Sequence, residues 1–500
     1  MSKPPDNESP WLRLWDARDR ARPRRSPKWL LVLAVVLVAA AVAAGAVMSV
    51  HPWRHGRSAV QFAPCTYYGH ISARCGSLLV PEDPADRHGR KIALHLAVIP
   101  ATRQPPAGAL FYLEGGPGGA ATDSAVMVNE VFAQVSRDRD LVMVDERGTG
   151  ESNRIACPRA HVPADDAAVV TSYLRRCFAR LGAAPTLYTT SAAADDLEAV
   201  RHALGYGRVD LFGGSYGATL AQVYLHRYPD SVRSAVLDGA SLLDVSLYER
   251  SAANAQHALD AELARCAATP ACQRAFPHER QELAVLLTRG PRRVTTDFGT
   301  FVLRPDDVAA TVAALLRSPE DAASIPYMVH AAAHGDYVPL ARTYAVDLGA
   351  DLDPRAQLAT FWVILCSEPW AGFDLGATAR DGVGSFLAHA SLARARLFGS
   401  ACRVVPRAAV PDDVRADGVI RSPVLLLAGS ADPVDPVGNI HGWKAVFPNG
   451  RLIVVSGGGH GVIDRGCLPA LVARFVARGT ASGLDASCAR RIELPPFATG

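Results

Sequence analysis

The feature that most constrains this chain is a glycine-flanked serine between a short apolar run and a helix-like segment. Residues 209–212 form the run, residues 213–217 are Gly-Gly-Ser-Tyr-Gly, and residues 218–228 have a helical pattern. This order predicts a strand, a sharp turn and a helix, with Ser215 at the turn. Only glycine tolerates the close backbone approach that such a turn imposes. Ser215 is therefore a candidate nucleophile, and a glycine-rich turn with a purely structural serine is the alternative.

An acid and a histidine follow two later apolar runs of the same kind. The run at residues 423–428 is closed by a turn that contains Asp432, and the run at residues 451–455 leads into a glycine-rich loop that carries His460. The carboxyl ends of parallel strands meet at one edge of a sheet, where open α/β sheets place their sites. We therefore expect these side chains to lie near the serine.

The chain order of the three groups predicts their roles. Ser215, Asp432 and His460 occur in the order found in α/β-hydrolases, which differs from that of two other serine protease folds. His460 would take the Ser215 proton and return it to the leaving group, while Asp432 would orient the imidazole and stabilise its charged form. Asp435 and Asp238, which also stand near strand ends, are the alternative acids.

A second glycine-rich turn predicts an oxyanion hole. The apolar run at residues 109–113 ends in Glu-Gly-Gly-Pro-Gly-Gly at residues 114–119. An amide of Gly115 or Gly116 would join the Tyr216 amide in stabilising a developing oxyanion. A plain turn is the alternative. The segment lacks both the phosphate-loop and the dinucleotide-binding patterns, so no nucleotide cofactor is expected.

The arrangement of apolar runs predicts an α/β fold with a mostly parallel sheet and helices on both faces. An amphipathic helix is expected at residues 191–204. The expected strands are residues 91–99, 109–113, 140–144, 209–212, 232–237, 423–428 and 451–455.

Between the two groups of strands the pattern becomes largely helical. A helical insertion between strands of such a sheet is most simply a cap over the active site, and we place it at residues 241–415. The expected helices are residues 248–266, 281–287, 306–316, 320–334 with a break at Pro326, 354–366 and 386–398. The hydrolase core would then consist of residues 60–240 and 416–492.

The N-terminus predicts a membrane anchor. Residues 1–28 are polar and arginine-rich, and residues 29–50 form an apolar run without a charge. About 20 apolar residues suffice to span a bilayer, and basic flanks stay in the cytoplasm. We favour an uncleaved signal anchor with an extracytoplasmic catalytic domain; a signal peptide cleaved near the small residues 43–46 is the alternative and would give a secreted protein.

The cysteines agree with export. Ten are spread along the chain without a C-x-x-C pair or a Cys/His cluster of zinc spacing, so no metal site is expected. In an oxidising compartment the simplest hypothesis joins sequence neighbours, although the spacing does not prove the connectivity. The hypothetical pairs are Cys65–Cys75, Cys157–Cys177, Cys266–Cys272, Cys366–Cys402 and Cys467–Cys488. A net charge of +3 gives no reason to expect a nucleic-acid partner.

Taken together, these motifs resemble the prolyl iminopeptidase branch of the α/β-hydrolases, and more closely the secreted tripeptidyl aminopeptidase-like proteins. The resemblance covers about residues 60–490 and implies serine exopeptidase chemistry on unblocked peptide N-termini, without a cofactor. Glu114 departs from it, because prolyl iminopeptidases have histidine there. The matching segments are residues 115–118, 145–152, 213–217, 432–434 and 458–461, with the cysteine-bearing lead-in at 65–81 and the paired tail at 467–488.

The resemblance also suggests a residue that recognises the substrate. Glu368, in Cys-Ser-Glu-Pro-Trp, resembles the glutamate-bearing segment of these relatives and would pair with the substrate's ammonium group. A solvated glutamate at a helix end is the alternative. Arg147 is expected to be a structural ion-pair residue. The alternatives to a peptidase are an esterase or lactone hydrolase with the same triad, and an inactive hydrolase fold used as a binding ectodomain.

Overall fold

The computed structural model describes residues 60–158, 166–181, 184–351, 358–415 and 418–499, which belong to one compact unit spanning residues 57–500. The expected cytoplasmic tail at 1–28 and signal anchor at 29–50 lie outside the described residues. In the part of the chain that the structure describes, no helix is both long and apolar enough to cross a membrane.

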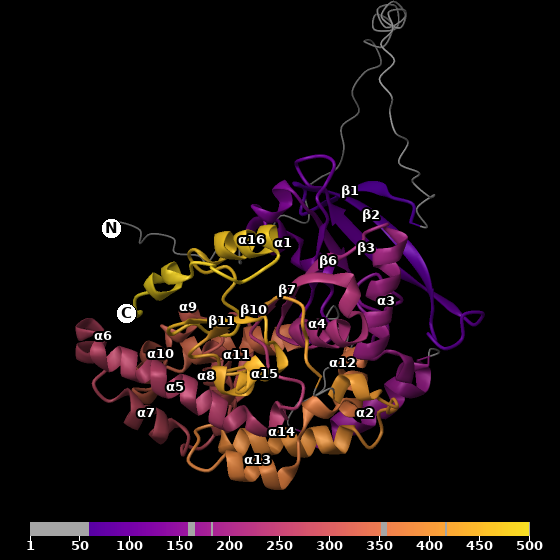
Figure 1. The fold of residues 1–500 in the computed structure, drawn as a ribbon. Helices are drawn as coiled ribbons and strands as arrows, with labels where there is room; N and C mark the ends of the chain where they lie inside the picture. The colour runs from indigo at the N-terminus through magenta and orange to yellow at the C-terminus, as the bar shows by residue number, and fades with distance from the viewer. Residues whose placement is uncertain (1–59, 159–165, 182–183, 352–357, 416–417, 500) are drawn as a thin grey trace, which may run out of the picture. The chain divides into compact units, whose positions relative to one another are not determined.

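The centre of the fold is a nine-stranded sheet (Figure 1) with the order β1-β2-β3-β5-β4-β6-β7-β10-β11. Strands β1 to β3 and β5 pair antiparallel, whereas every pairing from β5 through β4 to β11 is parallel. The strands are β1 (Ala63–Tyr67), β2 (Ile71–Pro81), β3 (Lys91–Ile99), β4 (Ala109–Leu113), β5 (Asp140–Val144), β6 (Val209–Gly214), β7 (Val232–Asp238), β10 (Val424–Gly429) and β11 (Arg451–Val455).

Helices connect and cover these strands. Between β7 and β10 in the sequence, the chain also forms a separate two-stranded hairpin. The hairpin consists of β8 (Arg292–Thr296) and β9 (Gly299–Leu303). The described α-helices are α1 (Ala125–Val131), α2 (Ala167–Arg180), α3 (Thr190–Ala203), α4 (Tyr216–Arg227), α5 (Ser251–Ala268), α6 (Pro270–Ala275), α7 (Glu279–Leu286), α8 (Pro305–Leu315), α9 (Pro319–Ala322), α10 (Ile325–Ala333), α11 (Val338–Asp351), α12 (Leu358–Ser367), α13 (Leu375–Asp381), α14 (Ala388–Ala401), α15 (Trp443–Val446) and α16 (Leu468–Arg478).

Both faces of the sheet are buried, as the continuous apolar strands predict. Successive strand residues point to opposite faces, so Leu96 and Ala97 belong to two different hydrophobic clusters. One cluster packs the sheet against α3 and α4, and the other packs it against α1 and α16 (Figure 1). The predicted α/β class with helices on both faces is therefore confirmed.

The expected cap region divides into two parts by its packing. Helices α5, α7, α8, α10 and α11 share a hydrophobic cluster of their own, with Leu259, Val312 and Leu340 among its buried members. Helices α12 and α14 instead contribute Val363 and Phe398 to the cluster that covers the sheet. The segment at 241–415 is therefore not packed as one body, and the predicted domain boundaries stay a prediction.

Five disulfides join sequence neighbours, as the spacing hypothesis proposed. The pairs are Cys65–Cys75, Cys157–Cys177, Cys266–Cys272, Cys366–Cys402 and Cys467–Cys488. All ten cysteines are used, and none is free. This pattern is typical of proteins that fold in an oxidising compartment.

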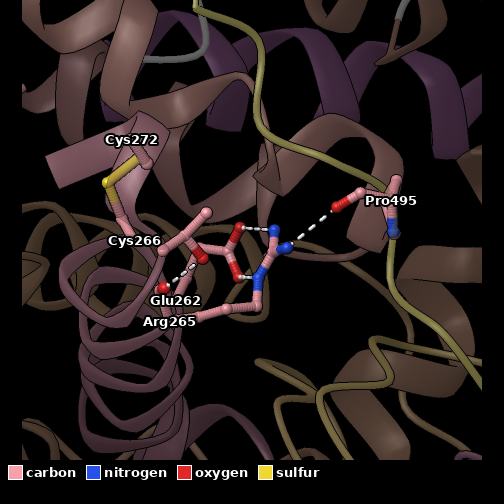
Figure 2. The surroundings of a disulfide bond; sticks show 6 residues. Glu262, Arg265, Cys266, Cys272 and Pro495 are labelled. Atoms are coloured by element: carbon pink, nitrogen blue, oxygen red, sulfur yellow. Dashed lines mark hydrogen bonds and ion pairs between the residues drawn. A yellow bond between two sulfur atoms is a disulfide. The ribbon is translucent and has the colours of Figure 1, made fainter. Parts of the chain in front are cut away.

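The C-terminal segment lies against α5 and fastens it to the rest of the unit. Arg265 forms an ion pair with Glu262 at 2.6 Å, donates to the Pro495 carbonyl at 2.8 Å and stacks on Phe497, as Figure 2 shows for the first two contacts. Phe497 joins the disulfide Cys266–Cys272 in one small buried cluster. Residues 495–497 thus cover part of the helix pair α5–α6.

Candidate active site

The predicted nucleophile lies on a strained turn between β6 and α4. Ser215 has φ 55° and ψ −125°, a conformation that non-glycine residues rarely adopt. A side chain at Gly213 would lie 2.2 Å from the Gly217 carbonyl oxygen, and one at Gly217 would lie 2.2 Å from the Leu113 carbonyl oxygen. Both flanking glycines are therefore required by sterics, which is what the sequence pattern predicts for a nucleophile turn.

The predicted base and acid meet at the ends of β11 and β10. Nδ1 of His460 lies 3.0 Å from Oδ2 of Asp432 and 3.2 Å from Oδ1. Asp432 is fully buried, and its Oδ1 also accepts the amide hydrogens of Val434 and Asp435 at 2.7 and 2.9 Å. These bonds fix the carboxylate, which in turn fixes the tautomer and orientation of the imidazole.

The electrostatics of this pair suit a base held by an acid. Burial alone would lower the pKa of His460, but the Asp432 charge and hydrogen bond outweigh it and raise the pKa above its ordinary value. Burial alone would raise the pKa of Asp432, yet the imidazole and the two backbone amides lower it below the ordinary range. The pair therefore favours a charged carboxylate beside an imidazole that binds a proton readily.

The two alternative acids are placed differently. Asp435 is 3.8 Å from Nδ1 of His460 and accepts a hydrogen bond from Ser241, and burial raises the pKa of Asp435 to about 6. Asp238 accepts the amide hydrogens of residues 462 and 463, and burial raises the pKa of Asp238 to about 7. Neither makes the direct bond to the imidazole that Asp432 makes.

Ser215 and His460 both border the end of β7. The amide of Ser215 donates to the Asp238 carbonyl at 2.9 Å, and a side chain built at Gly239 would lie 3.2 Å from Nδ1 of His460. Within the described residues, the Ser215 hydroxyl has no hydrogen-bond partner. The hydrogen bond between a nucleophilic serine and its histidine is often long before substrate binds and tightens only in the reactive complex.

The expected cap region, residues 241–415, directly contacts the loop that carries His460. The His460 amide donates to the Arg317 carbonyl at 2.7 Å, and a side chain at Gly459 would lie 2.3 Å from that same carbonyl oxygen. Arg465, five residues further on, forms an ion pair with Glu320 of α9. The position of the imidazole is therefore coupled to α8 and α9, a contact that the sequence pattern did not indicate.

The predicted oxyanion donors have unequal surroundings. The Gly115 amide donates to Oε1 of its neighbour Glu114 at 2.7 Å, so this N–H is already engaged. Gly116 has φ 124°, and Tyr216 stands at the first position of α4, where helix amides lack intrahelical partners. The geometry favours Gly116 over Gly115 as the partner of Tyr216.

Glu368 is buried and bound within the protein rather than exposed at a helix end. Its carboxylate accepts from the amide and the hydroxyl of Thr190 at 2.8 and 2.7 Å, and from Nε1 of Trp370 at 2.7 Å. The Thr190 hydroxyl also contacts the hydroxyl of Tyr216 at 2.7 Å. Glu368 is thus connected to the residue that follows Ser215, and a solvated glutamate is excluded.

Two further glutamates near this turn were not predicted to be site residues: Glu146, which is buried, and Glu114, which is partly buried. Burial raises the pKa of Glu114, which accepts from Tyr112 and Ser124 as well as from Gly115. Burial also raises the pKa of Glu146 well above its ordinary value, and no described donor reaches its buried Oε1. Glu114 directly follows β4 and Glu146 is the second residue after β5, and these positions are the signal that could have indicated them.

Arg147, next to Glu146, has the structural role that we expected. Its guanidinium forms a two-pronged ion pair with Asp196, with both N–O distances 2.7 Å, and it donates to the carbonyls of Glu82 and Leu187. The side chain is buried, so this pair ties the loop after β5 to α3.

The raised pKa of His460 predicts the acidic limb of the pH profile. A general base must be neutral to accept a proton, so kcat/KM should rise with pH through an inflection above the ordinary histidine value near 6.5. The measurement is kcat/KM for a p-nitrophenyl ester across pH 5 to 9. Asp238→Asn and Asp435→Asn test whether a neighbouring carboxyl group causes the inflection, because burial raises the pKa of Asp238 to about 7 and that of Asp435 to about 6. The Asp435 charge also raises the pKa of His460, so Asp435→Asn should move the inflection to lower pH without abolishing it. An inflection at or below pH 6.5 in the unaltered protein would contradict the assignment.

Comparison with known protein families identifies the class to which this fold and site belong. A family model described as the alpha/beta hydrolase fold matches residues 108–284, and a model described as TAP-like protein matches residues 390–488. The first segment includes Ser215, and the second includes Asp432 and His460. The chain therefore has the α/β-hydrolase fold, as its sequence pattern predicts.

The chain is also similar to individual proteins with this fold. The chain is 33% identical over 208 residues to the tripeptidyl aminopeptidase of Streptomyces lividans, covering 37% of this chain and 39% of that protein. It is 30% identical over 222 residues to the serine protease Hip1 of Mycobacterium bovis, with 40% and 42% covered, and 31% identical over 135 residues to the proline iminopeptidase of Neisseria gonorrhoeae, with 27% and 33% covered.

These matches confirm the expected resemblance to the tripeptidyl aminopeptidase-like proteins and prolyl iminopeptidases among the α/β-hydrolases. The chain spans about two fifths of the length of the first two of these relatives and a third of the last.

Proposed function

We propose that this protein is an exported serine aminopeptidase that cleaves peptides near a free N-terminus. The single observation that carries the proposal is the Asp432–His460 pair at the ends of β10 and β11, in the same sheet in which β6 is followed by Ser215 in a strained turn. The named activities of the three relatives, all of which are peptidases, support the choice of substrate.

In the proposed reaction His460 takes the hydroxyl proton of Ser215 as the oxygen attacks the scissile carbonyl carbon. The tetrahedral oxyanion would be stabilised by the amides of Gly116 and Tyr216. His460 then passes the proton to the leaving amine, which departs and leaves an acyl ester on Ser215. Water, deprotonated by His460, hydrolyses that ester and restores the serine. Asp432 stays ionised and stabilises the imidazolium throughout.

The N-terminus of the substrate would be recognised by Glu368. Its charge is held in place by Thr190 and Trp370, and the ring of Trp370 lies 6.0 Å from that of Tyr216, next to the serine. An ammonium group would join or displace one of these donors as a charge-assisted partner. Glu368 also lines a pocket of about 450 Å³ with Phe373 and Arg407.

N-terminal acetylation tests the peptidase proposal. Peptidyl p-nitroanilides with a free N-terminus should be cleaved, and their acetylated counterparts should lose at least about tenfold in kcat/KM, because one charge-assisted contact contributes more than about 1.4 kcal/mol. Glu368→Gln should reduce this discrimination, whereas Glu130→Gln on the exposed surface of α1 should leave it unchanged. Equal rates on both peptides with fast p-nitrophenyl ester cleavage would instead favour the esterase alternative.

Labelling with a fluorophosphonate separates both enzyme readings from an inactive binding ectodomain. A functional triad should give one covalent adduct per chain at Ser215, because the probe reacts with activated serines. A protein that binds peptide but takes up no probe would support the binding ectodomain.

The five disulfides indicate an extracytoplasmic protein. We further propose that residues 29–50 anchor it to the membrane. The full chain should then fractionate with membranes, and a version starting near His51 should be soluble. A mature N-terminus sequenced near residue 47 would show cleavage instead of anchoring.

A further inference from the structure

A cluster of residue types that commonly bind metals lies in the expected cap region, residues 241–415. Glu282 is on α7, His330 is on α10, and His334 caps the C-terminus of α10. One nitrogen of each imidazole and one oxygen of the carboxylate all lie within 4.8 Å of one another. No step of the proposed peptidase reaction uses any of the three.

The contacts among these side chains are close. Nδ1 of His330 lies 3.0 and 3.1 Å from the two oxygens of Glu282, and Nδ1 of His334 lies 3.8 Å from Oε1. The two imidazole rings are 4.2 Å apart. Residues four apart share a helix face, which is why His330 and His334 turn toward the same carboxylate on the neighbouring helix.

The backbones that carry these residues are fixed by packing. Leu283 and Leu286 of α7 and Val329 of α10 are buried in the same hydrophobic cluster. Phe276 lies against the His330 ring, with 5.4 Å between centroids. The helices thus hold the three groups near one another. Closing them around an ion requires side-chain rotation, and ligation through Nδ1 of His334 would also replace the 2.9 Å contact of that nitrogen with the His330 carbonyl.

We infer that Glu282, His330 and His334 form a binding site for a divalent transition metal, with Zn²⁺ as the best fit. Two imidazole nitrogens and one carboxylate oxygen are ligands that zinc accepts, at about 2.0–2.2 Å each. Ligands of one tetrahedral zinc are then about 3.4 Å apart, which these atoms approach already. The carboxylate balances part of the charge of the ion, and the exposed side of His334 leaves a position for water.

An ordinary ion pair in the same region differs from this three-residue cluster. His389 and Asp306 are 2.6 Å apart on the surface, but only one imidazole and one carboxylate take part. Two ligands on flexible side chains hold an ion weakly, whereas the third ligand from α7 would join two helices through the metal. Bound zinc would therefore clip α7 to α10 and stabilise this part of the fold.

Zinc titration of the purified full chain tests this inference. After the protein is stripped with a chelator, binding of Zn²⁺ is measured by calorimetry, and the melting temperature is measured with and without the ion. One equivalent should bind and raise the melting temperature. His334→Ala removes an exposed ligand and should weaken binding at least about tenfold, and Glu282→Gln should also weaken it, while His389→Ala should bind as the unaltered protein does.

Each other outcome overturns the site. Absence of stoichiometric binding would show that the cluster is only an ion pair between helices. Equal affinity in the unaltered protein and in His334→Ala would place the bound zinc elsewhere, and so would an equal loss in His389→Ala. Because the readouts are binding and melting, they do not depend on peptidase activity, so failure of one proposal does not affect the other.

Discussion

Replacing Ser215 by alanine should lower turnover of peptide substrates by about 10⁶-fold, because loss of the nucleophile removes the covalent route entirely. The protein should stay folded, since the described residues offer no hydrogen-bond partner to this hydroxyl. The measurement is kcat on a free-N-terminus p-nitroanilide together with fluorophosphonate labelling. Ser136→Ala is the matched control, because the Ser136 hydroxyl bonds only the nearby Ala133 carbonyl.

A companion substitution separates chemistry from conformation. Ser215→Gly should be as inactive as Ser215→Ala but more stable, because glycine adopts the positive φ of this turn without the strain of about 1–3 kcal/mol that other residues carry. Melting temperatures of the two variants check this. Residual turnover within tenfold of the unaltered enzyme in either variant would remove Ser215 from the mechanism.

Replacing Asp432 by asparagine should lower kcat by about 10⁴-fold, because the amide favours the wrong imidazole tautomer while leaving the shape of the site intact. Asp435→Asn should cost far less, since its carboxylate is 3.8 Å from the ring and already accepts from Ser241. Measuring kcat for both variants tests the choice between them. If Asp435→Asn were the more damaging substitution, the acid would be assigned wrongly.

The strand ends of the sheet could be predicted because the pattern there is local. The runs at 91–99, 109–113, 140–144 and 451–455 match strands β3, β4, β5 and β11 residue for residue. Strands β4 and β5 are buried throughout, so they are almost continuously apolar and are closed by turn residues, which makes their limits visible in the sequence. Pro326 likewise marks a real interruption, since α9 and α10 are separate helices and Pro326 lies in the first turn of α10.

The expected cap region was harder to predict, because its elements are held by tertiary contacts. The hairpin β8–β9 was wrongly included in a largely helical region. Its exposed strands contain few buried residues, so periodicity gives little signal. Helices α11 and α13 were not predicted either.

Long-range contacts limited the prediction of the site. The sequence predicted Asp432 and His460 as site residues, but it could not show that Glu114 engages the Gly115 amide or that Thr190 holds Glu368, 178 residues away. The cluster of Glu282, His330 and His334 was missed for the same reason. The spacing of His330 and His334 was visible, but Glu282 reaches them only because two helices pack together.

The order of the disulfides has a consequence for biogenesis. Each cysteine pairs with the next one along the chain, and the closed segments span 6 to 36 residues. As the polypeptide emerges from a translocation pore, every cysteine thus meets its partner before the following pair appears. Oxidation can proceed in the order of synthesis, without the reshuffling by an isomerase that interleaved pairs demand.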